Sequence, residues 1–133
     1  MNINAPLASL LKVEIYQEKS EVGFVLGANL GDVNHQITVH LDRKYAVVCA
    51  QALRQAESLL AAGKPGTIDC RPYMCIVMDI DPERGGIVLC VHMTTGEHYF
   101  FLDGSSTITQ CADTLLAAAL KLQMSDQEKV TWH

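Results

Sequence analysis

The sequence predicts an α+β fold: two β-β-β-α units that form an antiparallel sheet with two helices packed on one face. Short segments alternate apolar and polar residues with a period of two, as strands with one wet face do. Two longer segments space their apolar residues by three and four, as amphipathic helices do. The order strand, strand, strand, helix occurs twice along the 133 residues. We expect a single domain over residues 1–133, with pseudo-repeats at about 1–64 and 65–133.

Two segments have the apolar spacing of helices. Residues 43–62 carry one apolar stripe, with Asp42 before it as the predicted N-cap and Gly63 after it as a stop signal. Residues 106–123 carry a broader stripe, and we expect this helix to begin within the polar run 105–107.

Six segments are predicted strands: 11–18, 22–28, 35–41, 73–80, 87–93 and 97–102. In the first, Leu11, Val13 and Ile15 are expected on one face. The fourth and fifth are apolar at successive positions, which is typical of strands covered on both faces. The runs 81–86 and 94–96 contain the Gly and Pro residues of hairpin turns.

Short sequence matches between the two halves indicate an internal duplication. Their separations are 63, 61 and 62 residues, so they differ by single-residue slips. The alternative is that short apolar sequences match by chance in a hydrophobic chain. The matched segments are Gly23–Leu26 with Gly86–Leu89, Leu41-Asp42 with Leu102-Asp103, and Cys49–Leu53 with Cys111–Leu115.

Charge and hydropathy exclude several classes of protein. Ten basic and 15 acidic side chains give a net charge of -5, which argues against nucleic acid as a partner. No apolar run approaches the roughly 20 residues of a membrane span. The first residues do not resemble a secretory signal, so we expect a cytoplasmic protein. All of the net charge lies in residues 65–133, which favours a basic partner there; solubility alone is the alternative explanation.

Five cysteines are expected to be reduced, because the chain is long enough to build a core without disulfides. Most of them lie in apolar periodic segments, where a thiol behaves as a small hydrophobic group. Cys70 is the one thiol with an activating neighbour, Arg71, but no third residue can be named for a nucleophilic site. We therefore predict no catalytic residue.

Two sets of residues are weak candidates for metal binding. Asp79 and Asp81 would project from one face of a strand, although Pro82 indicates a solvated turn instead. A three-residue turn would set His92 opposite His98, with a cysteine nearby, which is a fragment of a zinc site. Structural zinc needs four ligands, so whether these residues bind a metal stays open, and we predict no cofactor.

The function that the sequence favours is non-enzymatic: a regulatory or chaperone-like module that binds another protein through an apolar sheet face or a strand edge, as a homodimer. The element order and acidity resemble those of small homodimeric secretion chaperones, at the level of the fold alone. The alternative is a small-molecule- or metal-binding protein, or a hydrolase-type enzyme, using Asp79, Asp81 and the His92/His98 hairpin. The predicted interaction surface consists of Tyr73, Val77, Cys90, His92, Tyr99, Phe101 and Trp132.

Overall fold

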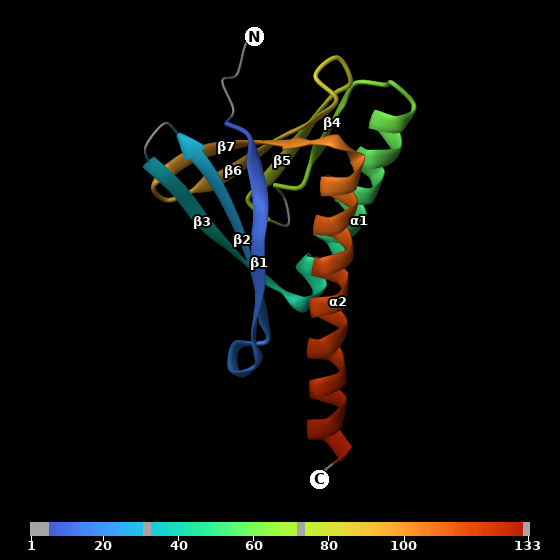
Figure 1. Cartoon of the computed structure of the whole chain (residues 1–133). Coiled ribbons are helices and arrows are strands. Elements are labelled where there is room, and N and C mark those ends of the chain that lie inside the picture. Colours follow the sequence, from blue (N-terminus) through green and yellow to red (C-terminus); the bar gives the residue numbers. More distant parts are fainter. Residues whose placement is uncertain (1–5, 31–32, 72–73, 132–133) are drawn as a thin grey trace.

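The computed structural model describes residues 6–30, 33–71 and 74–131, and in this part of the chain it is an α+β protein (Figure 1). In chain order the elements are β1 (Ala8–Tyr16), a 3-10 turn (Gln17–Lys19), β2 (Glu21–Leu30), β3 (Val33–Asp42), α1 (Arg43–Ala61), β4 (Gly66–Asp69), β5 (Ile76–Asp81), β6 (Gly86–Met93), β7 (Gly96–Asp103) and α2 (Gly104–Thr131).

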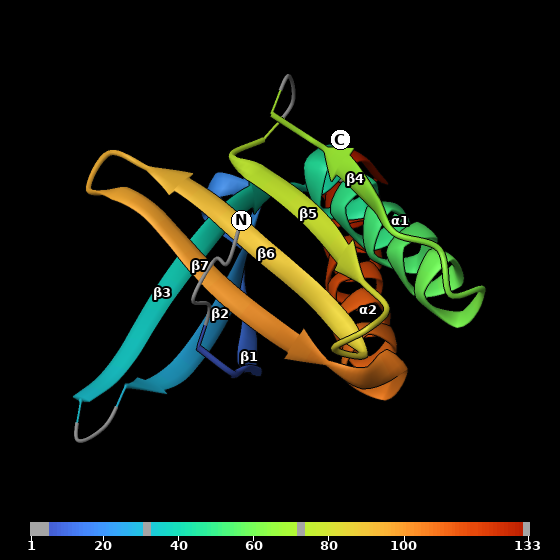
Figure 2. The same cartoon turned by 90° about the horizontal axis from the view of Figure 1, so that it is seen from above.

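The strands form two antiparallel sheets, so the prediction of one sheet was wrong. The first has the order β1-β2-β3 and the second the order β4-β5-β6-β7. Figure 2 shows the strands of one sheet crossing those of the other. In the described part of the chain, Leu7, just before β1, forms one parallel bridge with Phe101 of β7. Pairing ends there because the chain then turns away to form β1, which pairs with β2 instead.

One hydrophobic core joins both sheets and both helices. The helices pack side by side and cover the inner faces of the sheets (Figures 1 and 2). Ile37, Val39 and Leu41 are buried as the alternation of β3 predicts. The largest side chains that are completely buried come from all of these layers: Phe24, Phe100, Leu26, Leu53, Ile76, Met78, Ile87, Leu89, Leu102, Ile108, Leu115 and Leu122.

The first helix begins and ends where the sequence predicts. The side chain of Asp42 accepts a hydrogen bond from the backbone N–H of Tyr45 at 2.8 Å, which makes it the N-cap. Gly63 takes a φ of 68° and donates its N–H to Leu60, as a residue that ends a helix does.

The second helix is longer than predicted at both ends. It begins at Gly104, directly after Asp103, and not within the serine and threonine run. It continues to Thr131, past the apolar stripe on which the prediction depended. Within the described residues, neither helix contains a stretch long and apolar enough to cross a membrane.

Two details of the sheets also differ from the prediction. The β1–β2 register shifts between Leu10 and Lys12, and this bulge leaves Leu11 47% exposed, away from Val13 and Ile15. The short strand β4 was not predicted, because four residues carry too little alternation to indicate a strand.

The two halves share the order of three paired strands followed by a helix, with β4 as an addition to the second half. The hairpins β2–β3 and β6–β7 have the same register after a shift of 63 residues. Leu30 pairs with Val33 across two residues, and Met93 pairs with Gly96 in the same way. A duplication would produce this regularity, and the duplication itself stays a prediction.

Candidate functional site

The outer face of the second sheet, which faces away from the helices, collects the polar side chains of β5, β6 and β7. The strand register places Val77, Cys90 and Tyr99 in one row across these strands and pairs His92 with Glu97 in the next. The described members of the predicted interaction surface are therefore neighbours on one face: Val77, Cys90, His92, Tyr99 and Phe101.

Burial within this predicted surface is uneven. Cys90 and Phe101 are each only 7% exposed, whereas Val77, His92 and Tyr99 are half-buried. The guanidinium of Arg84 lies 4.4 Å from the centre of the Phe101 ring and helps to cover it. Tyr73 and Trp132 lie outside the described residues.

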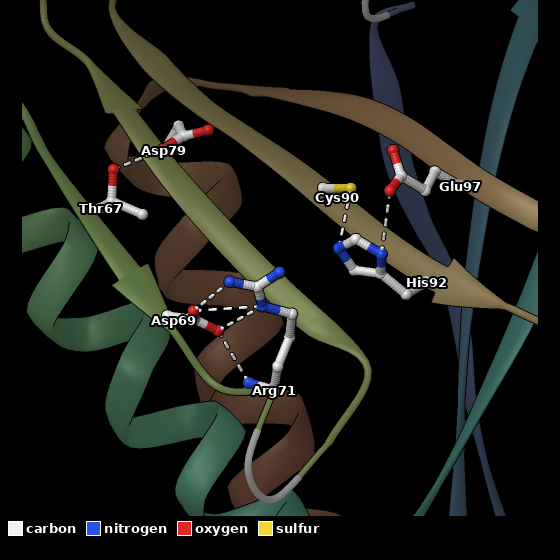
Figure 3. Close-up of polar contacts among 7 residues, drawn as sticks. All are labelled: Thr67, Asp69, Arg71, Asp79, Cys90, His92 and Glu97. Atoms are coloured by element: carbon white, nitrogen blue, oxygen red, sulfur yellow. Dashed lines mark hydrogen bonds and ion pairs between the residues drawn. The ribbon is translucent and has the colours of Figure 1, made fainter.

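A thiol, an imidazole and a carboxylate meet on this face (Figure 3). The sulfur of Cys90 lies 3.5 Å from Nε2 of His92, and Nδ1 of the same ring lies 3.3 Å from Oε1 of Glu97. The hydroxyl of Tyr99 donates a hydrogen bond to Oε2 of Glu97 at 2.5 Å. We call Cys90, His92 and Glu97 the outer-face cluster.

The sequence did not reveal Glu97, because the expected turn length placed His98 opposite His92, where the structure has Glu97. The β6–β7 turn contains two residues, not three, so His92 pairs with Glu97 and His98 pairs with Val91. A shift of one residue moves a side chain to the other face of a strand, and His98 accordingly faces inward. The signal that could have revealed Glu97 is the tight turn.

The inward-facing His98 contacts the first sheet. Its Nδ1 lies 3.2 Å from Nε2 of His35 on β3, and the two rings stack with centroids 5.2 Å apart. The His35 ring also stacks on Phe100 at 6.0 Å. His98 therefore helps to join the two sheets and takes no part in the outer-face cluster.

The two predicted aspartates share one face of β5, as expected, but each carboxylate already has a partner. Asp79 accepts a hydrogen bond from the hydroxyl of Thr67 at 2.6 Å (Figure 3). Asp81 accepts one from the backbone N–H of Arg84 at 3.3 Å, within the β5–β6 turn. The structure brings neither of them into the outer-face cluster.

Next to the cluster, the side chain and the backbone N–H of Arg71 both donate hydrogen bonds to the carboxylate of Asp69 (Figure 3). The closest contact joins Nη2 to Oδ2 at 2.6 Å. These hydrogen bonds lower the pKa of Asp69 to about 2. Arg71 therefore does not activate Cys70, whose pKa is raised by burial.

The order thiol, imidazole, carboxylate matches that of a nucleophile, its base and an orienting group. Burial raises the pKa of Cys90, however, which favours the neutral and unreactive thiol. Sulfur, nitrogen and carboxylate oxygen are instead the donors that zinc and similar transition metals take in proteins. The cluster is better suited to hold a cation than to attack a substrate.

The edge strands of the two sheets differ in how far they are protected from pairing with another chain. Long, regular edge strands attract other chains, and proteins protect them with bulges, lysines, short strands or covering segments. β1 has the bulge before Lys12 and lies beside α2. β4 is four residues long. At β7, the N–H of Phe101 donates to the carbonyl oxygen of Pro6 at 2.8 Å.

The remaining edge, β3, has none of these protections in the part of the chain that the structure describes. It is ten residues long, pairs with β2 without a register shift, and contains no proline, lysine or arginine. No other described strand pairs with its outer edge. Its inner side chains are anchored in the core, so the edge is held in an extended form.

The register also indicates which amides of β3 point outward. In a hairpin with a two-residue connection, the residues that flank the connection bond to each other, and every second pair does the same. In β6–β7 this rule sends the N–H of Phe101 outward and that of His92 to β5, as observed. The same rule directs the amides of Asn34, Gln36 and Thr38 toward the open edge.

A groove lies elsewhere, where the starts of β1 and α2 approach the ends of β2 and β7. It has a volume of about 620 Å³. Leu7 and Leu11, which are exposed, line it together with Asn34. Among the described residues that line it there is no histidine or cysteine, and Asp103 is the one ionisable side chain. The groove therefore offers no set of catalytic or metal-binding groups.

Comparisons with protein-family models, with curated proteins and with solved structures return no match for this chain.

Proposed function

We propose that this protein is a non-enzymatic protein-binding module that takes an extended segment of a partner protein as an additional strand on β3. The observation that carries the proposal is the contrast among the edges: β1 has a bulge, β4 is short and β7 is bridged at Phe101, whereas β3 is long and regular and no described strand lies beside its outer edge. Strand addition uses backbone hydrogen bonds for affinity and alternate side chains for specificity.

The faces of β3 suggest what such a segment would contain. Ile37 and Val39 face the core, so the partner side chains beside them would meet apolar surface. Gln36, Thr38 and His40 face outward, so the alternate side chains of the partner would meet polar groups. A segment of alternating apolar and polar residues is therefore preferred. The net charge of -5 favours lysine or arginine at its polar positions through long-range attraction.

A second copy of this chain is the competing occupant of the edge. Two β3 strands could pair around a two-fold axis and join two three-stranded sheets into one. That arrangement would pair the outward backbone groups of both β3 strands with each other, so a partner segment could not bind there. Light scattering across a range of protein concentrations separates the two: a monomer, or a dimer that Gln36→Pro leaves intact, keeps the β3 edge open, whereas a dimer that Gln36→Pro dissociates would contradict the proposal.

The direct test uses labelled peptides of about ten residues, the length of a long strand. One peptide alternates valine with lysine and threonine, and a control of the same composition does not alternate. We expect the alternating peptide to bind more tightly in fluorescence anisotropy. Gln36→Pro removes an outward amide without breaking the β2 ladder and should weaken binding at least about tenfold. Gln36→Val keeps the amide and should bind like the wild type.

Hydrogen exchange locates the contact independently of affinity. The amides of Asn34, Gln36, Thr38 and His40 should exchange quickly in the free protein and slowly with the peptide bound. Equal binding of the two peptides, or protection confined to other strands, would contradict strand addition on β3.

A further inference from the structure

We propose that Cys90, His92 and Glu97 form a binding site for a divalent transition metal of the zinc class, with the remaining coordination position open to solvent. The site lies on the outer face of the second sheet, whereas the proposed strand-binding edge belongs to the first. Failure to bind metal at the outer-face site would therefore not affect the proposed strand addition on β3, and failure of strand addition would not affect metal binding.

The geometry of the β6–β7 hairpin sets the ligands in place. Cys90 and His92 are two residues apart on β6, so both project from the same face, and Glu97 is the direct cross-strand partner of His92. Each residue offers one ligand atom, and the three atoms lie within 4.8 Å of one another. Because the hairpin is a regular part of a four-stranded sheet, their backbone positions are fixed before any ion arrives.

The distances are close to those of a tetrahedral zinc site. Typical Zn–S and Zn–N bonds place sulfur and nitrogen roughly 3.5 Å apart. The sulfur of Cys90 and Nε2 of His92 are 3.5 Å apart. Glu97 lies on the Nδ1 side of the ring, so its carboxylate must swing toward Nε2 to share an ion with Cys90 and His92. That side chain is 51% exposed and has the freedom to do so.

A neighbouring residue orients the carboxylate. Tyr99 lies directly across the strands from Cys90, and its hydroxyl donates to Oε2 of Glu97 while Oε1 faces the imidazole. Residues of this kind hold metal ligands in position, and their loss typically weakens metal binding by about 10- to 100-fold.

The local charge also favours a divalent cation. With its thiol ionised, Cys90 would carry one negative charge, and Glu97, Asp79 and Asp69 add negative charge around it, against the single positive charge of Arg71. A divalent cation is therefore attracted to this face. The sulfur and nitrogen donors favour zinc, cobalt or copper over calcium and magnesium, which prefer oxygen. His92 is 31% exposed, so an ion can reach the site from solvent.

The test is titration of the purified chain with Co²⁺ and then Zn²⁺. We expect one Co²⁺ per chain, a thiolate-to-cobalt charge-transfer band in the near ultraviolet, and displacement by Zn²⁺. Cys90→Ser should abolish the band, and His92→Gln should weaken binding at least about 100-fold. Tyr99→Phe should weaken binding by about tenfold and keep the band, because the ligands remain.

Matched controls separate this site from other cysteines and histidines. Cys75→Ser removes a half-buried thiol outside the cluster, and His98→Gln removes the inward histidine; both should bind Co²⁺ like the wild type. His92 is part-exposed, so His92→Gln should fold normally, which circular dichroism verifies. The absence of a charge-transfer band in the wild type, or its survival in Cys90→Ser, would overturn the proposal.

Discussion

His35 and His98 stack on each other across the two sheets, and they are 63 residues apart. The same shift superposes the register of hairpin β6–β7 on that of β2–β3. Each histidine thus occupies the equivalent position in its own half, and the two contact each other where the halves meet. If the two halves arose by duplication, the axis that relates them would pass near this contact.

This contact should couple the stabilities of the two sheets. We expect a double-mutant cycle with His35→Ala and His98→Ala to give a coupling free energy of about 0.5–1.5 kcal/mol, the range for stacked rings. Urea unfolding of the four proteins measures it. His35→Ala combined with His92→Ala is the control and should be additive, because His92 lies on the opposite face. Additivity in the His35/His98 cycle would show that the stack contributes nothing specific.

Gly86 lies at a close approach between β6 and β7. A Cβ atom there would overlap the carbonyl oxygen of Leu102 and the ring of Phe101. We expect Gly86→Ala to lower the free energy of unfolding by about 3 kcal/mol or more, because backbone would have to shift. Gly66→Ala is the matched control: its Cβ would make ordinary contact with Leu59, and it should change stability by less than about 1 kcal/mol. Equal effects of the two substitutions would contradict this account.

The N-cap of α1 gives a third expectation. Asp42→Ala removes the acceptor for the N–H of Tyr45 and should lower the free energy of unfolding by about 1 kcal/mol. Asp42→Asn keeps an oxygen at that position and should recover most of the loss. Chemical denaturation of both variants provides the comparison, and an Asn variant as unstable as the Ala variant would argue against capping.

Patterns that extend over many residues predicted the α+β class and the first helix. The apolar stripe of α1 and its cap at Asp42 depend on local chemistry, and both are confirmed. Strand alternation likewise predicted which side chains of β3 are buried. The pairing of the strands into two sheets depends instead on which distant segments meet, and alternation within a segment does not encode that.

Errors at the candidate site arose from single-residue shifts. A two-residue turn moved His98 inward and brought Glu97 opposite His92. A bulge turned Leu11 outward. Because side chains alternate with a period of two, one residue decides which face a side chain occupies. Which side chains share one face of a hairpin therefore depends on the length of its turn, and the sequence alone did not determine that length here.

The Asp69–Arg71 pair should be visible in a pH titration. Hydrogen bonds from Arg71 lower the pKa of Asp69 from 3.8 to about 2. Because the pKa is lower in the folded state, the contribution of this pair to stability is present above about pH 4 and is lost as the pH falls through about 2. Carboxyl NMR should show this pKa directly. Arg71→Gln should return it to its ordinary value, and an unchanged pKa in that variant would contradict the assignment.

The last expectation concerns the tyrosine beside the outer-face cluster. Donation of its hydroxyl to Glu97 raises the pKa of Tyr99 to about 12, because losing the proton would leave two negative oxygens in contact. Glu97→Gln should bring this pKa back toward 10.0, measured as tyrosinate absorbance in metal-free buffer with Tyr99→Phe as the subtraction standard. Tyr16 has the same relationship to Glu14, so Glu14→Gln is the matched control and should leave Tyr99 unaffected. If Glu97→Gln leaves the pKa of Tyr99 unchanged, the carboxylate is not held by that hydroxyl, and Tyr99 cannot orient it toward a metal.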